Sequence, residues 1–151
     1  MKIDRSKCAG CGRCIGVCPK NAIDADYAGQ AVEICNMKIA EYSAAVLYNR
    51  PQFHLNFVMD VTPTCDCHDS NDVPIISNVG IFASVDPVAI DSACADVVNR
   101  QPILPGSVLD GKKTSGDYFH DIHPIVNWRP LLDHAEKLGL GRQDYELIEV
   151  K

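Results

Sequence analysis

The sequence lacks the features that would assign it to several common functional classes. No apolar run approaches the roughly 20 residues that a membrane-spanning helix needs. No Lys/Arg-rich segment offsets a formal net charge of −6, so neither nucleic acids nor anionic membranes are expected partners. The first residues do not read as a signal peptide. A phosphate-binding loop, a complete dinucleotide fingerprint and a Ser/His/Asp arrangement are also missing, so none of these indicates the chemistry.

Aromatic residues are scarce, with one Trp among 151 residues, but 46% of the residues are hydrophobic and can form a core. This length suits one domain, or a small module joined to a modest one. Cysteine, by contrast, is abundant: the chain has eight, without a secretory signal. That combination predicts a cytoplasmic, reducing location and metal ligation rather than disulfides.

The clearest motif is a cysteine loop at residues 8–19. Cys8, Cys11, Cys14 and Cys18 are separated by two, two and three residues, and Pro19 closes the run. A bacterial ferredoxin loop has this spacing, and its fourth cysteine binds the other cluster in two-cluster proteins. The glycines of the loop let the backbone approach an inorganic core closely. A zinc knuckle and a disulfide scaffold are the alternatives, but zinc sites usually use two separated cysteine pairs.

Four further cysteines lie outside the loop. Because a cubane takes four thiolates, eight cysteines could hold two [4Fe–4S] clusters, with Cys18 joining three remote cysteines on the second. Two alternative arrangements remain open. The chain could hold one cluster and leave the other thiols unligated, or it could bind a mononuclear metal at the Cys65/Cys67 pair. Cys94 falls on an expected helix, where a role as a small core residue is equally expected. The candidate ligands are Cys8, Cys11, Cys14, Cys18, Cys35, Cys65, Cys67 and Cys94.

Periodicity and turn signals predict an α/β protein of mixed α+β type, with a half-ferredoxin module packed on a small mixed sheet with helices. The module occupies residues 1–34 and contains short strands at 2–4 and 31–34. The α/β domain occupies residues 35–151 and contributes further cysteine ligands. Its expected elements are a helix over 36–49, a buried strand over 53–61, a strand over 79–84, a helix over 86–99, a surface loop over 101–117, a helix opened by 128–130 and closed by glycines 139 and 141, and a strand over 145–150.

Several polar residues are weaker candidates. Asp86 precedes a proline and is expected to cap a helix, although a helix N-terminus beside a strand end can also bind an anion. His68 follows the second group of cysteines and could be an extra ligand. His120 and His123 form a pair without a third ligand, so a structural or solvated role is expected for both.

Residues 56–63, Cys65-Asp66-Cys67, 80–84, 86–91 and 131–148 together resemble the Domain of Unknown Function 362 family. More narrowly, they resemble its iron–sulfur members with an inserted ferredoxin-type module. Two departures stand out: the second ferredoxin loop of that group is reduced here to Cys35, and an α/β portion that precedes the cysteine loop is lacking. The resemblance therefore implies the C-terminal part of a larger protein or a split subunit. Its strands would then favour oligomerisation or a partner chain.

Together these patterns predict one-electron transfer through one or two [4Fe–4S] clusters, at a low potential, to or within a redox partner. The partner would be a redox protein or the missing N-terminal portion, and a homo-oligomer is a further option. The second hypothesis is a redox enzyme whose Cys65/Cys67 site, with Asp86, Asp91 or His68, presents an open metal or cluster position. The third is a structural metal site that stabilises a small domain.

Overall fold

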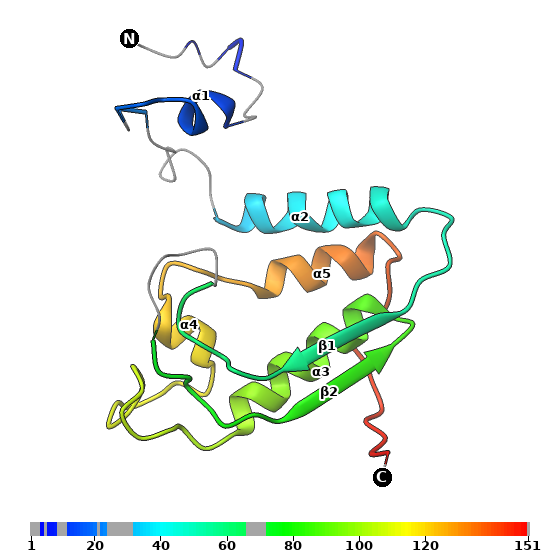
Figure 1. The fold of residues 1–151 in the computed structure, drawn as a ribbon. Helices are drawn as coiled ribbons and strands as arrows, with labels where there is room; N and C mark the ends of the chain where they lie inside the picture. The colour runs from blue at the N-terminus through cyan, green and yellow to red at the C-terminus, as the bar shows by residue number, and fades with distance from the viewer. Residues whose placement is uncertain are drawn as a thin grey trace. The chain divides into compact units, whose positions relative to one another are not determined.

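The computed structural model describes residues 4, 6–8, 12–20, 22–23, 32–65 and 72–150. The chain forms two compact units, Met1–Ala31 and Val32–Lys151. We call the second unit the α+β body. Figure 1 shows both units as ribbons.

The first unit is organised by short-range backbone hydrogen bonds. Gly12 has a φ of 67°, a left-handed conformation that suits glycine, and begins the one-turn helix α1 (Arg13–Gly16). The amides of Ile15 and Gly16 both donate to the carbonyl of Gly12, and the amide of Cys18 donates to that of Ile15. None of the four residues of α1 is buried. Among the described residues of this unit, local hydrogen bonds therefore set the path of the chain.

In the α+β body, helix α2 (Val32–Leu47) packs against helix α5 (Arg129–Lys137), and Figure 1 shows the two side by side. Their contact is a small apolar cluster in which Ala40, Val88, Leu132 and Ala135 are each at most 4% exposed. Trp128, Leu131 and Leu140 pack around it. The alanines allow the two helices to approach closely.

Strands β1 (His54–Val58) and β2 (Gly80–Ser84) form an antiparallel pair, with Phe57 opposite Ile81. Helix α3 (Pro87–Arg100) packs against this pair (Figure 1). The main core lies between α3 and the strand pair and extends to residues 101–118. Its buried members are Val58, Ile75, Ile76, Ile90, Cys94, Val98, Leu109 and Tyr118.

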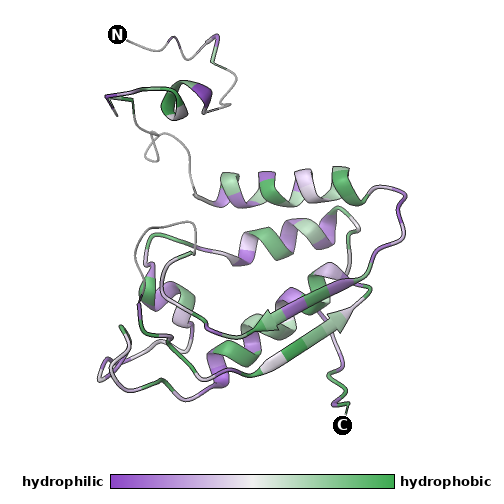
Figure 2. Ribbon diagram, in the orientation of Figure 1, coloured by the Kyte–Doolittle hydropathy of each residue, from purple (hydrophilic) through white to green (hydrophobic). Residues whose placement is uncertain are grey.

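The other face of the sheet is open. Side chains alternate between the two faces of a strand, and Leu55, Phe57 and Ile81 are 52%, 61% and 61% exposed. Figure 2 shows β2 as largely hydrophobic. The expectation of a buried strand over 53–61 is therefore wrong for one of its two faces. A continuous apolar run suggests burial on both sides, but here α3 covers one side.

Residues 101–117 are not simply a surface loop. Leu109 is 1% exposed and Ser107 is buried, while Ile103 forms an isolated antiparallel bridge with Ile76. The short helix α4 (Tyr118–Ile122) follows, with Asp117 as its N-cap. This segment closes one end of the main core.

The mixed α+β class is confirmed, and among the described residues the sheet is a two-stranded antiparallel pair rather than a mixed sheet. The helices expected over 36–49, 86–99 and from 128 correspond to α2, α3 and α5. The strand expected at 31–34 is wrong where it is described, because Val32–Ile34 begin α2. The terminal strand is also wrong, since residues 145–150 adopt no regular structure.

Of the strand expected at 2–4, residues 2 and 3 lie outside the described residues. In the part of the chain that is described, none of the helices has the length and apolarity needed to cross a membrane.

Candidate functional site

The described cysteines of the loop differ in exposure. Cys8 and Cys14 are exposed, and Cys18 is half-buried. The amide of Ala22 donates to the Sγ of Cys18 over 3.3 Å. Hydrogen bonds from backbone amides to cysteine sulfur are one way in which proteins stabilise thiolate ligands and set cluster potentials. Cys11 lies outside the described residues.

A turn built on Asp4 leads into this loop. Its carboxylate oxygen Oδ1 accepts from the amide of Ser6 (3.1 Å) and from the hydroxyl of Ser6 (2.7 Å), and its carbonyl accepts from the amide of Lys7 (3.1 Å). Such Asx turns fix the chain direction locally. Sequence reasoning missed this role of Asp4, although an Asp two residues before a Ser is a recognisable signal.

The segment that carries Cys65 is held at several points in the α+β body. Asp60 has a φ of 48°, and its amide donates to Asn78 over 2.7 Å. The amide of Ile75 donates to the carbonyl of Val61 over 2.8 Å. Further along, Nε2 of His123 bonds the carbonyl of Pro63 over 2.7 Å. A loop tethered in this way can place its thiol reproducibly.

Cys65 itself is exposed at an open pocket beside the end of β1. The pocket combines apolar side chains with hydroxyls and carboxylates. Its lining includes Phe57, Met59, Asp60, Thr62, Thr64, Cys65 and Asp72. Cys67 and His68, the other candidates of this site, lie outside the described residues.

Cys94 has the opposite environment. It lies on α3 inside the main core and is 9% exposed. Burial raises the pKa of its thiol; a hydrogen bond from Asn56, 3.6 Å away, lowers it, and the charge of Asp91 raises it. The neutral thiol is therefore favoured, whereas metal ligation needs the thiolate. This position matches a small core residue, and ligation by Cys94 stays a prediction.

Cys35 occupies a third environment, near the start of α2. It is exposed and lines an apolar groove with Ile39, Tyr42 and Val46. Within the described residues, no three His, Cys, Asp or Glu side chains are grouped in a way that could hold a metal ion. The structure therefore does not bring Cys35, Cys65 and Cys94 together as a ready ligand set.

Asp86 caps α3, as expected. Its Oδ1 accepts from the amides of Val88 and Ala89, both over 2.9 Å, and its Oδ2 accepts from the amide of Arg142 over 2.9 Å. A Cβ at Gly141 would lie 1.9 Å from that Oδ1. The carboxylate thus occupies the helix N-terminus itself and ties it to the segment after α5. The glycine at 141 is required by this close approach, which sequence reasoning assigned only to helix closure.

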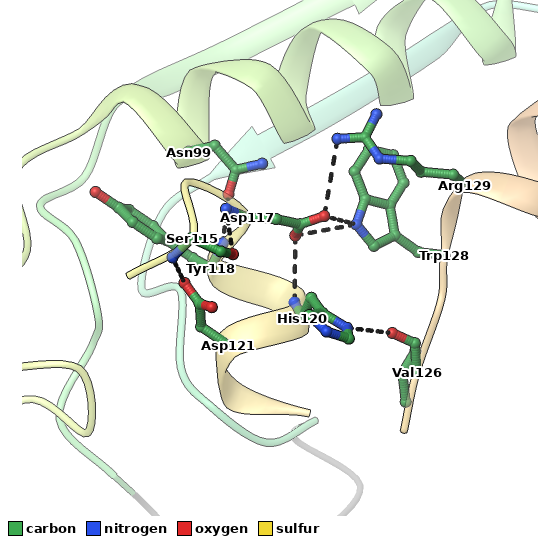
Figure 3. A network of polar contacts seen from close by, with 9 residues as sticks. All are labelled: Asn99, Ser115, Asp117, Tyr118, His120, Asp121, Val126, Trp128 and Arg129. Carbon is green, nitrogen blue, oxygen red and sulfur yellow. Dashed lines mark hydrogen bonds and ion pairs between the residues drawn. The ribbon is translucent and has the colours of Figure 1, made fainter. Parts of the chain in front are cut away.

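A second polar network joins α4 to the start of α5 (Figure 3). Both carboxylate oxygens of Asp117 accept from Nε1 of Trp128, at 3.2 and 3.0 Å, and the guanidinium of Arg129 lies 3.8 Å away. His120 bonds the carbonyl of Val126 through Nδ1. Since His120 and His123 each bond a separate backbone carbonyl, the structural role expected for this pair fits the geometry.

Comparison with known proteins gives one match. The family model "Domain of unknown function (DUF362)" matches residues 10–96, more than half of the chain. The chain belongs to the DUF362 family. The match runs from the cysteine loop into α3 and includes every cysteine except Cys8. No curated protein and no solved structure matches the chain.

Proposed function

We propose that this DUF362 protein is an iron–sulfur protein that holds one or two [4Fe–4S] clusters and transfers single electrons to or within a redox partner. The observation that carries this proposal is the Cys8-x2-Cys11-x2-Cys14-x3-Cys18-Pro19 run, because its spacing and closing proline are those of a ferredoxin loop.

The described part of the loop fits such a cluster. Cys14 lies in the one-turn helix α1 and Cys18 follows its end by two residues, while Gly12 adopts the left-handed conformation that brings backbone amides to one side of a tight turn. The sulfur of Cys18 already accepts an amide hydrogen bond. When bound, the cluster would supply a one-electron couple, and the chain's own contribution would be thiolates and amide donors.

The potential of that couple would be low. A cubane held by four thiolates is anionic, and the chain carries a formal net charge of −6. Both disfavour the addition of an electron. We expect a midpoint potential negative of the hydrogen electrode in an anaerobic redox titration, and a positive value would contradict this account.

One observation favours a second candidate, a redox enzyme. Cys65 stands at an open pocket whose lining mixes apolar side chains with Thr62, Thr64 and two aspartates. A metal or cluster with only three protein ligands at this site would leave a position for substrate. The roles suggested for Asp86 and Asp91 in such a site are weakened, since Asp86 caps α3 and Asp91 accepts from Asn56 over 2.9 Å.

The test compares Cys14→Ala with Cys94→Ala in the anaerobically purified 151-residue chain. We expect Cys14→Ala to lose the iron and the reduced-state EPR signal of the loop cluster, because the loop would be one thiolate short. Cys94→Ala should keep both, because Cys94 packs in the core. Retention of all iron and of the EPR signal in Cys14→Ala would refute the loop cluster.

The variant Cys65→Ala distinguishes the two candidates. Loss of a second EPR signal with four-thiolate character would assign Cys65 to an electron-transfer cluster. A signal that broadens or shifts when small ligands are added to the wild type, and that Cys65→Ala abolishes, would instead favour the enzyme.

A further inference from the structure

The open face of the sheet gathers exposed apolar side chains from both strands. We define the outer face as the seven large apolar side chains that alternate outward along β1 and β2 and just beyond their ends. Leu55 and Phe57 lie on β1 and Ile81 lies on β2, with Phe57 and Ile81 directly opposite one another. The outer face comprises Phe53 (66% exposed), Leu55 (52%), Phe57 (61%), Met59 (43%), Val79 (36%), Ile81 (61%) and Val85 (69%).

We propose that the outer face is the interface of a homodimer, in which the sheets of two copies of this chain pack face to face about a two-fold axis. This proposal does not depend on the loop cluster, because every residue of the outer face belongs to the α+β body. Two of its residues, Phe57 and Met59, also line the pocket of Cys65.

The area argues for an interface of this size. An aromatic side chain offers about 150–250 Å² for burial, and the seven large apolar side chains are between 36% and 69% exposed. Together they expose several hundred Å² of apolar surface. The largest patch of a typical monomer is about 300–600 Å², and a standard interface buries about 800 Å² per partner. The apolar area of the outer face therefore approaches the area that one partner of a stable dimer buries.

The chemistry of the face argues for a second copy rather than a different protein. A two-fold contact places one patch against itself, so the patch must be complementary to itself. Neither β1 (His-Leu-Asn-Phe-Val) nor β2 (Gly-Ile-Phe-Ala-Ser) carries a charged residue, and no charged side chain belongs to the outer face. Two copies that each carry a net charge of −6 can therefore meet along the two strands without like charges in contact, while Asp60 and Asp72 lie at one end of the face beside Phe57 and Met59.

Face-to-face packing of the two sheets accounts for the exposed apolar side chains, whereas edge-to-edge pairing of strands does not. Two copies joined through strand edges would satisfy backbone hydrogen bonds but leave Phe57 and Ile81 in water. Sheets packed face to face at about 10 Å remove these side chains from water. A homodimer interface is typically more apolar than the rest of a protein surface, as the outer face is.

Sedimentation equilibrium of the anaerobically purified 151-residue chain tests the proposal. We expect the wild type to have twice the monomer mass at micromolar concentration. Phe57→Lys and Ile81→Lys, on opposite strands, should each raise the dissociation constant at least about 30-fold, as central interface positions do. The control Ile125→Lys changes a more exposed apolar residue outside the outer face (84% exposed) and should leave the dimer intact.

Three results would overturn the proposal. The first is a monomeric wild type at 100 micromolar or so, well above typical dissociation constants. The second is a dimer that survives both Phe57→Lys and Ile81→Lys but dissociates in Val46→Lys, on the exposed side of α2. The third is a different polypeptide that co-purifies in equal amount and is lost in Phe57→Lys.

A measurement on the wild type alone guards against variants that fail to fold. Hydrogen–deuterium exchange is compared at low and at high protein concentration. Protection of residues 53–59 and 79–85 that rises with concentration supports the dimer, and protection independent of concentration contradicts it.

Discussion

Different kinds of interaction stabilise the cysteine loop and the α+β body. The loop depends on local interactions: a left-handed Gly12, an Asx turn at Asp4, and backbone hydrogen bonds between residues three or four apart. The body depends on side chains far apart in sequence, such as Val58, Ile76 and Leu109 in one core. The comparison suggests that ligand chemistry and stability are separated along the chain. Changes in one unit should then leave the property of the other intact.

Removal of iron should give the largest effect. If the loop holds a cluster, an anaerobic oxidant with a chelator should abolish the visible absorbance and the EPR signal. The α+β body should keep its helical circular dichroism and a cooperative urea transition, because its two apolar clusters consist of body residues. Collapse of that transition after iron removal would instead support a structural metal site, in which metal binding is part of the folding free energy.

The next largest effect is expected from Gly141→Ala. The added Cβ would lie 1.9 Å from Oδ1 of Asp86, and the carboxylate cannot withdraw without losing its three amide donors. We expect the free energy of unfolding to fall by about 1–3 kcal/mol, as for other overpacked sites, with the iron content unchanged. Urea unfolding and iron analysis measure the two.

A double-mutant cycle provides the control for this substitution. Asp86→Ala alone should cost about 1–2 kcal/mol through loss of the helix cap. In the Asp86→Ala background, Gly141→Ala should cost much less, because the clashing carboxylate is gone. Additive effects would show that Gly141 matters for another reason.

The smallest effect is expected from Tyr145→Phe. The phenol of Tyr145 donates to Asp96 over 2.8 Å. Partial burial and then the Asp96 carboxylate raise the pKa of Tyr145 above its ordinary value. This raised pKa makes a contribution to stability that is fully present below pH 10 or so and is lost as pH rises through the folded-state pKa.

At neutral pH, Tyr145→Phe should therefore lower the free energy of unfolding by about 1 kcal/mol or less. Urea titrations of both proteins between pH 8 and about pH 11 should show this difference shrink as the pH increases. If the difference in unfolding free energy between the two proteins grew with pH, the hydrogen bond from Tyr145 to Asp96 would not be what stabilises the fold.

Local signals in the sequence predicted much of the fold. Asp86 followed by proline marked the start of α3, and the spacing of Met37, Ala40 and Ala44 marked α2. The failures have non-local causes. Alternation at 145–150 suggested a strand, but a strand also needs a neighbour, and Leu147 and Val150 remain exposed. Helix α4 was missed because its cap, Asp117, is paired with Trp128 and Arg129, which lie beyond the following turn.

The candidate site was predictable to a similar extent. Spacing alone makes Cys8, Cys11, Cys14 and Cys18 candidate ligands, because a ferredoxin loop is a local motif, and their ligation stays a prediction. A count of cysteines grouped Cys35, Cys65 and Cys94, yet these occupy a helix groove, an open pocket and a core. Only the three-dimensional structure distinguishes a thiol that is accessible to a metal ion from one that is packed in the core.

Iron and acid-labile sulfide per chain, with zinc counted in the same sample, test the central proposal most directly. The measurement is made on anaerobically purified wild-type protein, with an EPR spectrum after reduction. One cubane predicts about four iron and four sulfide per chain, and two predict about eight of each. Either value with a reduced-cluster signal would support the account. Zinc without sulfide would contradict it.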